Sequence, residues 1–251
     1  MNKAYVQQYA KLEKEHWWFI VRSKIILNAL KQSNLAPPLH ILNIGAAGGE
    51  SSNWLSAWGT VVSLETEAAF IEHLQSENFN VVNASITNMP FENETFDLVC
   101  AFDVIEHVED DLAATQEIAR VCKKGGSICI TVPAFKILWG QHDVVNNHLR
   151  RYTKKSLLAL CKELSQIENT RMRYFNSLLF IPILIVRKIT EYLLKSKAGN
   201  ESDFRLFRRN RIMNQIFKTI FSIESILPEW MSFPVGVSLL SIWKKKENSR
   251  L

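Results

Sequence analysis

The segment ILNIGAAGGE, residues 41–50, constrains the fold of this chain more than any other feature. It predicts a buried strand over residues 39–44 that runs directly into a glycine-rich turn and then a helix. Such a turn needs glycine for positive φ angles and for close approach of a ligand to bare backbone. The N–H groups that open the following helix then face the ligand. The pattern indicates a nucleotide-binding α/β domain.

The turn does not match the fingerprint of nicotinamide-binding domains. The pattern G-x-G-x-x-G would need glycine at positions 47 and 50, where this chain has Ala47 and Glu50. The last glycine of that fingerprint permits close packing of helix on strand, so a nicotinamide cofactor is disfavoured. Glu65 lies twenty residues after Gly45 at the end of the next expected strand, where a carboxylate can bind ribose hydroxyls. A surface glutamate beside a tight turn is the alternative.

Strands and helices alternate along the first 135 residues, which predicts a parallel sheet with crossover helices. The expected strands are 39–44, 60–65, 79–83, 96–102 and 127–133, and the expected helices are 5–32, 50–58, 67–76 and 110–122. After Pro133 we expect a polar segment (142–153), a helix (154–164), a strand (169–175), a helical stretch (177–227) and a closing strand (236–245). The motif KKGG, residues 123–126, is a helix stop.

Charge is unevenly distributed along the 251 residues. Residues 1–150 carry a net charge of −6 and residues 151–251 a net charge of +11. This asymmetry is typical of a C-terminal part that meets an anionic surface or ligand, or of a solvated basic face. The four cysteines form no C-x-x-C pair and have no clustered histidines, so we expect neither a disulfide framework nor a metal site.

Two features bear on localisation. The first 15 residues have no apolar core, unlike a signal peptide. The longest uncharged apolar run, Ser177 to Val186, is about half of the ~20 residues that span a bilayer. We therefore expect a cytoplasmic protein, either free or associated with a membrane surface.

Four motifs in order carry a family resemblance over about residues 39–135. They are NIGAAGG, Ser85-Ile86 followed by Met89-Pro90-Phe91, the strand FDLV at 96–99, and KKGG before a strand. In these motifs the chain resembles the class I S-adenosylmethionine-dependent methyltransferases of type 11 or 12. The resemblance implies a Rossmann-like, mostly parallel seven-stranded sheet with helices on both faces. S-adenosyl-L-methionine would be the cofactor and S-adenosyl-L-homocysteine the product.

The resemblance also implies one domain, divided into a helical cap (1–38), a cofactor-binding core (39–174), a helical insertion (175–235) and the last strand (236–245). The cofactor-binding residues carried over are Asn43, Gly45, Ala47, Gly49, Glu65, Ser85, Ile86, Phe102 and Asp103. Glu65 would hold the ribose hydroxyls, and Phe102 and Asp103 would lie beside the methionine end. Asn43, Ala47 and Ser85 depart from the family pattern, and Ala47 fits if its φ is negative.

Catalytic candidates follow the fourth and fifth expected strands, because ligands of open α/β sheets bind at the carboxyl ends. Asp103, Glu106 and His107 follow one strand, and His142, Asp143, His148 and Tyr152 follow the next. We expect catalytic roles for His107, His142 and Tyr152, since a histidine suits a general base near neutral pH. The alternative is that these side chains cap helices or bind loop backbone.

Candidate acceptor-binding residues come from two aromatic and basic clusters. EHWWFIVR contributes Trp18 and Arg22, and the segment 142–153 contributes Asp143, His148, Arg150 and Arg151. Both clusters recur in a subset of the family, which implies that the N-terminal helix folds over the cofactor. The adjacent arginines could clamp a phosphate or carboxylate, or belong to a surface ion-pair network.

The C-terminal helical stretches, residues 173–197 and 205–221, combine apolar and basic residues. Such helices can lie in a membrane interface, bind a lipid-tailed acceptor, cover the sheet or form a dimer surface. The leading functional prediction is methyl transfer to a small-molecule, lipid-linked or glycan-linked acceptor. The alternatives are a catalytically weak cofactor-binding protein and a nucleic-acid methyltransferase. The pI of 9.0 favours the last, but FDVIEH stands where an NPPY-type motif would be. The acceptor atom and oligomeric state are left open.

Overall fold

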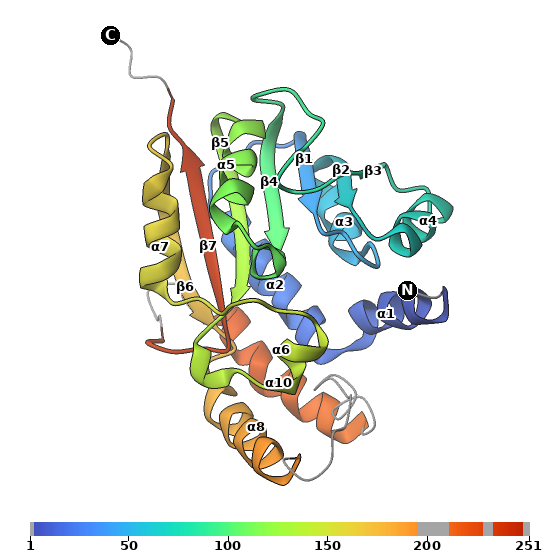
Figure 1. Cartoon of the computed structure of the whole chain (residues 1–251), viewed down its shortest axis with the longest axis vertical. Helices are drawn as coiled ribbons and strands as arrows, with labels where there is room; N and C mark the ends of the chain where they lie inside the picture. The colour runs from blue at the N-terminus through green and yellow to red at the C-terminus, as the bar shows by residue number, and fades with distance from the viewer. Residues whose placement is uncertain (1–2, 195–210, 228–232, 248–251) are drawn as a thin grey trace.

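The computed structural model describes residues 3–194, 211–227 and 233–247. Its centre is a seven-stranded sheet in the order β3-β2-β1-β4-β5-β7-β6 (Figure 1). The strands are β1 (Leu39–Ile44), β2 (Gly59–Glu65), β3 (Val81–Asn83), β4 (Phe96–Phe102), β5 (Cys122–Pro133), β6 (Ile167–Phe175) and β7 (Ser238–Lys245). β7 runs antiparallel to both neighbours, and the other pairings are parallel. The predicted Rossmann-like, mostly parallel sheet is confirmed.

The centre of the sheet is apolar on both faces, as parallel strands covered by helices require. β1 and β4 are neighbours, with Ile41 opposite Leu98 and Ile44 opposite Ala101. All four of these side chains are at most 1 % exposed. Both strands begin and end where the sequence predicts, because recognisable turn residues flank each apolar run.

Helices cover both faces. α5 (Asp111–Val121) and α7 (Lys154–Glu163) pack on one face, and α2 (Trp17–Lys31), α3 (Glu50–Leu55) and α10 (Arg211–Ile226) pack on the other. α4 (Ala68–Ser76) packs beside β3, and short helices α6 (Gln141–Val145) and η2 (Ile105–His107) follow β5 and β4. The remaining elements are α1 (Lys3–Glu15), α8 (Phe180–Leu194), η1 (Ser56–Trp58) and η3 (Lys136–Leu138).

Several predicted boundaries differ from the structure: β3, β6 and β7 begin two residues away from the expected starts, and the described helices of the stretch 177–227 are α8 and α10. Two further differences have a local cause. The helix expected over residues 5–32 is two helices, because His16 is extended (φ −80°, ψ 135°) and its side chain accepts a hydrogen bond from the Trp18 N–H. The KKGG motif lies inside β5 rather than before it. A register shift between Phe96 and Leu98 in the β4–β5 pair accommodates these extra residues.

α10 is held against α2 by both polar and apolar contacts. Asn214 accepts from the Trp17 N–H at 3.2 Å, and Asn28 donates to the Ser225 carbonyl at 2.8 Å. Phe221 is fully buried, and its ring centroid lies 5.7 Å from that of Trp17. The helices between β6 and β7 therefore contribute to the core beside α2.

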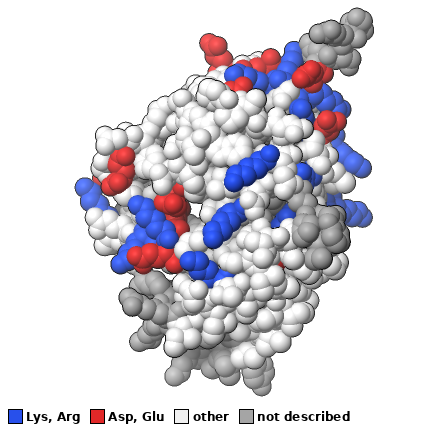
Figure 2. All heavy atoms as spheres, turned by 180° about the vertical axis from the view of Figure 1, so that it is seen from behind, with Lys and Arg blue, Asp and Glu red and all other residues white. Residues whose placement is uncertain are grey.

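The strands β1, β4 and β5 point to the end of the sheet where α1, α6, α8 and α10 lie (Figure 1). Seen from behind, the lower part of the molecule carries few charged side chains among the described residues (Figure 2). None of the described helices is long and apolar enough to cross a membrane. The basic residues Lys195 and Lys197 and the segment 205–210 of the expected interfacial helices lie outside the described residues.

Candidate functional site

A cavity of about 460 Å³ opens at the carboxyl ends of the parallel strands. This is the end of an open α/β sheet at which ligands bind, and the volume lies in the usual range for a small-molecule site. Its wall combines residues of the glycine turn, the end of β2, the loops after β4 and β5, and the helices α1 and α2.

The glycine turn forms one side of the cavity. Gly45 has φ +68°, and a Cβ built on it would lie 2.7 Å from Cγ2 of Val104 in the loop after β4. This position therefore accepts no side chain. Ala47 also lines the cavity, but its φ is +46°, so the condition for alanine to fit this turn without strain is not met. The left-handed conformation of alanine costs about 1–2 kcal/mol, which the rest of the turn must offset.

Glu65 fixes this turn from the end of β2. One carboxylate oxygen accepts from the Ala47 N–H at 3.0 Å, and the other accepts from the N–H groups of Thr66 and Glu67 at 2.8 and 3.1 Å. The residue lines the cavity and is 9 % exposed. An ionised carboxylate has about four acceptor positions, so Glu65 can still bind a ribose hydroxyl. The turn and the carboxylate therefore fit a nucleoside.

Four predicted cofactor-binding residues lie outside the cavity wall. Asn43 is buried beneath the turn, and its amide donates to the hydroxyls of Ser51 and Ser52, both at 2.8 Å. Gly49 is the N-cap residue of α3. Ser85 is exposed beyond β3, and Ile86 is buried in the core. Asn43 supports the turn through α3 instead of facing the cavity.

The predicted cap does cover the cavity. Trp18 and Arg22 of α2 line it, as do Phe102 and Asp103 at the end of β4. Arg22 forms an ion pair with Asp103, and its guanidinium carbon lies 4.5 Å from the Trp18 ring centroid. Asp103 also accepts from the Thr131 hydroxyl at 3.2 Å. This pair joins the cap to the sheet beside the turn.

Glu13 of α1 is a site residue that the sequence did not predict. It is 7 % exposed, and one oxygen accepts from the Glu50 N–H at 3.3 Å, at the start of α3. Burial raises the pKa of Glu13 to about 7. In the sequence it is one of several charged residues of a polar helix, and no local signal marks it as buried.

Three histidines from the segments after β4 and β5 lie close together in the cavity wall. His107, His142 and His148 all line it, and the His148 ring centroid lies 4.8 Å from that of His107 and 5.7 Å from that of His142. Burial lowers the pKa of His142 to about 3 and also lowers the pKa of His107. Both rings are therefore neutral near pH 7, but a pKa of about 3 makes His142 a weak proton acceptor at that pH. The catalytic roles expected for His107 and His142 stay predictions.

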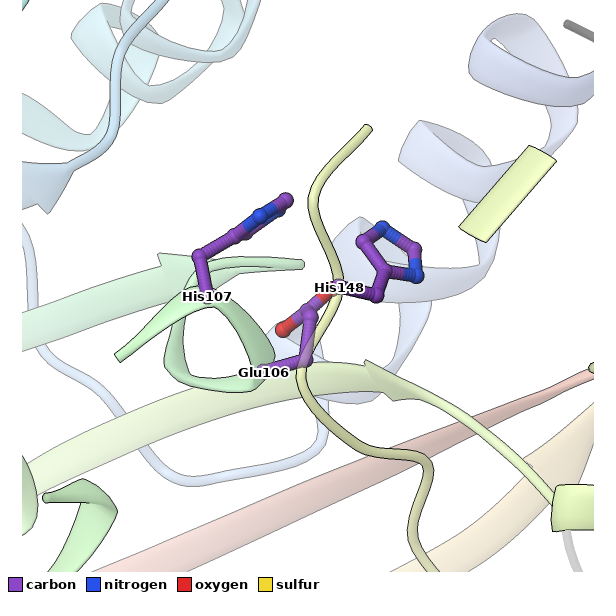
Figure 3. A group of neighbouring side chains, drawn as sticks. All are labelled: Glu106, His107 and His148. Carbon is purple, nitrogen blue, oxygen red and sulfur yellow. The ribbon is translucent and has the colours of Figure 1, made fainter. Parts of the chain in front are cut away.

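Glu106 lies beside His107 and His148 and lines the cavity (Figure 3); the sequence placed it among the candidates after the fourth strand but assigned it no role. It is 0 % exposed, and within the described residues neither carboxylate oxygen bonds to another residue. Burial and the charge of Asp103 raise its pKa well above the usual value. The sequence signal was its place beside His107 after β4.

In the segment after β5, internal ion pairs hold the predicted acceptor-binding residues Asp143, Arg150 and Arg151. Asp143 is fully buried and binds Arg151 through both oxygens, with distances of 2.8 and 3.0 Å. Arg150 pairs with Asp111 at 2.9 Å. The expected clamp of two arginines on an acceptor is therefore wrong, because internal carboxylates occupy both guanidinium groups.

Tyr152 is also a correction. It lies outside the cavity wall, is 4 % exposed, and donates to a carboxylate oxygen of Asp111 at 2.7 Å. Burial raises its pKa far above the usual value. A phenol that holds its proton this strongly and does not reach the cavity cannot act as the predicted catalytic group.

Comparison with known proteins decides the family. The family model of a methyltransferase domain matches residues 42–130, which include the glycine turn, Glu65 and the loop after β4. A Mycobacterium tuberculosis protein named as a probable S-adenosylmethionine-dependent methyltransferase is 24 % identical over 125 residues, covering 49 % of this chain and 44 % of that protein.

Residues 42–130 of the chain form a class I S-adenosylmethionine-dependent methyltransferase domain. Its cofactor is therefore S-adenosyl-L-methionine.

Two further similarities place this methyltransferase among known proteins. The demethylmenaquinone methyltransferase of Corynebacterium urealyticum is 26 % identical over 122 residues, covering 48 % of this chain and 53 % of that enzyme. In fold, the chain is similar to a solved structure from the Haloferax volcanii complex of the Trm112 activator and a candidate methyltransferase. That similarity has a TM-score of 0.63 at 12 % identity and covers 99 % and 97 % of the two chains. The chain spans about half the length, or less, of the curated relatives it matches.

Proposed function

We propose that this chain transfers the methyl group of S-adenosylmethionine to a small-molecule, lipid-linked or glycan-linked acceptor. One observation carries the proposal: the cavity that contains the Glu65 carboxylate and the glycine turn also has two neutral histidines, His107 and His142, in its wall. A nucleoside held at the turn would direct its methionine end toward Asp103 and these rings.

The position of each residue in the cavity wall supports a particular role. Gly45 and Ala47 offer bare backbone to the cofactor, and Glu65 accepts from the ribose hydroxyls. When bound, the cofactor supplies a methyl group on a positively charged sulfur. Methyl transfer then depends mainly on alignment and on exclusion of water. Trp18 and Arg22 of the cap line the cavity, and Arg22 joins the cap to the sheet through its ion pair with Asp103, with its guanidinium against the Trp18 ring.

A proton acceptor is needed if the acceptor loses a proton. His142 is one candidate because it lines the cavity and is neutral near pH 7, although a pKa of about 3 makes it a weak base there. His107 is the second candidate because its ring is exposed to the cavity. The acceptor proton would move to one of these rings as the methyl group is transferred.

The helices between β6 and β7 support an acceptor with a lipid tail. Exposed apolar side chains recur on α8 and α10: Ile181, Ile185, Ile189, Ile212, Ile216 and Ile223. On α8 they are spaced four residues apart and so share one face. The Corynebacterium relative is named for a quinone substrate, which supports the same class of acceptor. An anionic membrane surface is the partner that this face and the basic C-terminal part would bind.

Transfer of labelled methyl groups from S-adenosylmethionine to an extract, separated into lipid and aqueous fractions, tests the proposal. We expect label in one fraction with the wild-type chain and a loss of at least ~10-fold with Glu65→Ala. Glu72→Ala is the matched control, since Glu72 is exposed on α4. If S-adenosylhomocysteine binds but no fraction is labelled, the chain is the inert cofactor-binding protein that Asn43 and Ala47 suggested.

The membrane partner has a separate test. Vesicles of phosphatidylcholine with and without 30 % (roughly) phosphatidylserine are sedimented with the wild-type chain and with Ile185→Ser. We expect binding to the anionic vesicles and weaker binding of the variant. Equal sedimentation of the two proteins, or none with either vesicle, would refute membrane association and leave the methyltransferase proposal intact.

A further inference from the structure

The Glu106 carboxylate is a buried acidic group without a stabilising neighbour. It is 0 % exposed, and within the described residues both oxygens lack a hydrogen-bond partner on another residue. A buried carboxylate is costly unless it is paired, hydrogen-bonded or bound to a metal. Its nearest basic residues are already bound elsewhere, Arg22 to Asp103 and Arg151 to Asp143. Within the described residues, Glu106 therefore has no ion-pair partner.

Two imidazole rings face this carboxylate (Figure 3). His107 follows Glu106 on η2, and His148 comes from the loop after α6. One ligand atom from each of the three residues lies within 4.8 Å of the other two. All three residues line the cavity, so an ion between them would be reachable from it.

The His148 ring is oriented as metal-binding histidines are. Its Nδ1 lies 2.8 Å from a carboxylate oxygen of Asp143. Asp143 is itself fixed by Arg151 at 2.8 Å and by the Gly140 N–H at 2.9 Å. The ionised carboxylate accepts from Nδ1, which leaves the Nε2 lone pair for a ligand bond. A histidine held by a carboxylate in this way is a recurrent support of metal sites.

We propose that Glu106, His107 and His148 form a binding site for a divalent first-row transition metal ion beside the cofactor. One carboxylate and two imidazoles are a ligand set that suits Zn²⁺ and its neighbours, and three protein ligands leave a position open to the cavity. The next step rests on the proposed function. The coordination position of the ion that no protein ligand fills would bind an oxygen atom of the methyl acceptor. The acceptor class is then a hydroxyl compound: the ion makes its proton easier to remove, and the proton passes to water in the cavity, because His107 is then a ligand rather than the base.

Binding of the metal alone provides the test. The full chain is stripped with a chelator and titrated with Co²⁺, whose visible absorption reports ligation, and then with Zn²⁺ as competitor. We expect one Co²⁺ per chain, displaced by Zn²⁺. His107→Ala and Glu106→Gln should each weaken Co²⁺ binding at least ~10-fold. His73→Ala is the matched control, because His73 lies on α4 and outside the cavity wall.

His107→Ala decides the outcome if Glu106→Gln does not fold, because the His107 ring is exposed and its removal leaves no buried gap. The proposal is overturned if the wild-type chain binds no Co²⁺, or if His107→Ala binds it as tightly as His73→Ala does. S-adenosylhomocysteine is titrated into the same samples. Binding of this product without Co²⁺ binding would refute the metal site alone, and Co²⁺ binding without product binding would refute the proposed function alone.

Discussion

Raising the pH from 5 to 9 should weaken the packing of α1 on the glycine turn. Glu13 is 7 % exposed, and burial raises its pKa from the usual 4.5 to about 7. A folded-state pKa above the unfolded value stabilises the fold at low pH. That contribution is complete below about pH 4.5 and is lost as the pH rises through 7. A shift of this size corresponds to about 3 kcal/mol.

Glu13→Gln isolates this contribution, since the amide keeps the volume and an acceptor oxygen for the Glu50 N–H but has no proton to lose. Urea unfolding at pH 5 and pH 9 measures the free energy of unfolding of both proteins. We expect the variant to exceed the wild type by up to about 3 kcal/mol at pH 9 and to match it within about 0.5 kcal/mol at pH 5.

Hydrogen exchange of the α1 amides reports the same loss of stability between pH 5 and pH 9, provided that α1 opens locally before the whole chain unfolds. Glu15→Gln is the control, because Glu15 is exposed on the same helix and pairs with Lys11. The reasoning fails if the stability difference between Glu13→Gln and wild type is the same at both pH values, or is larger at pH 5.

Three substitutions test the packing that forms the site, with urea unfolding as the measurement. Gly48→Ala should lower the free energy of unfolding by about 1–3 kcal/mol, because the new Cβ would lie 2.7 Å from Cα of Ala10 in α1. An unchanged urea midpoint would contradict the close approach of α1 to the glycine turn. Asp143→Asn should cost about 3–5 kcal/mol by leaving the buried Arg151 unpaired, whereas a cost below ~1 kcal/mol would disprove its burial. Phe221→Ala should cost about 3–5 kcal/mol, and a neutral result would show that α10 does not pack on α2.

The sheet could be predicted from the sequence because its signals are local. The runs 39–44 and 96–102 are apolar and bounded by glycine, proline or polar residues, and both strands have those bounds. The cavity wall at Gly45 and Glu65 followed from their separation and their place at strand ends. Each of these inferences needs only the neighbouring residues and the rule that ligands bind at the carboxyl edge.

The errors concern side chains whose partners are distant in sequence. Arg150 and Tyr152 were assigned to the acceptor and to catalysis, but Asp111, about forty residues away, binds both. Glu13 is buried because α1 packs against the end of the glycine turn, where Glu13 accepts a hydrogen bond from Glu50, a residue 37 positions later in the chain. Ala47 has a positive φ because the turn and the N–H bond to Glu65 impose it. Composition and residue spacing do not predict such contacts, because the partners are far apart in the sequence.

A crystal structure with S-adenosylhomocysteine would test most directly whether the glycine turn and Glu65 bind the cofactor. The account predicts ribose hydroxyls about 3 Å from the Glu65 carboxylate oxygens, with the sulfur on the side of Asp103 and His107. A ligand bound elsewhere in the chain, or a ribose that makes no contact with Glu65, would contradict it.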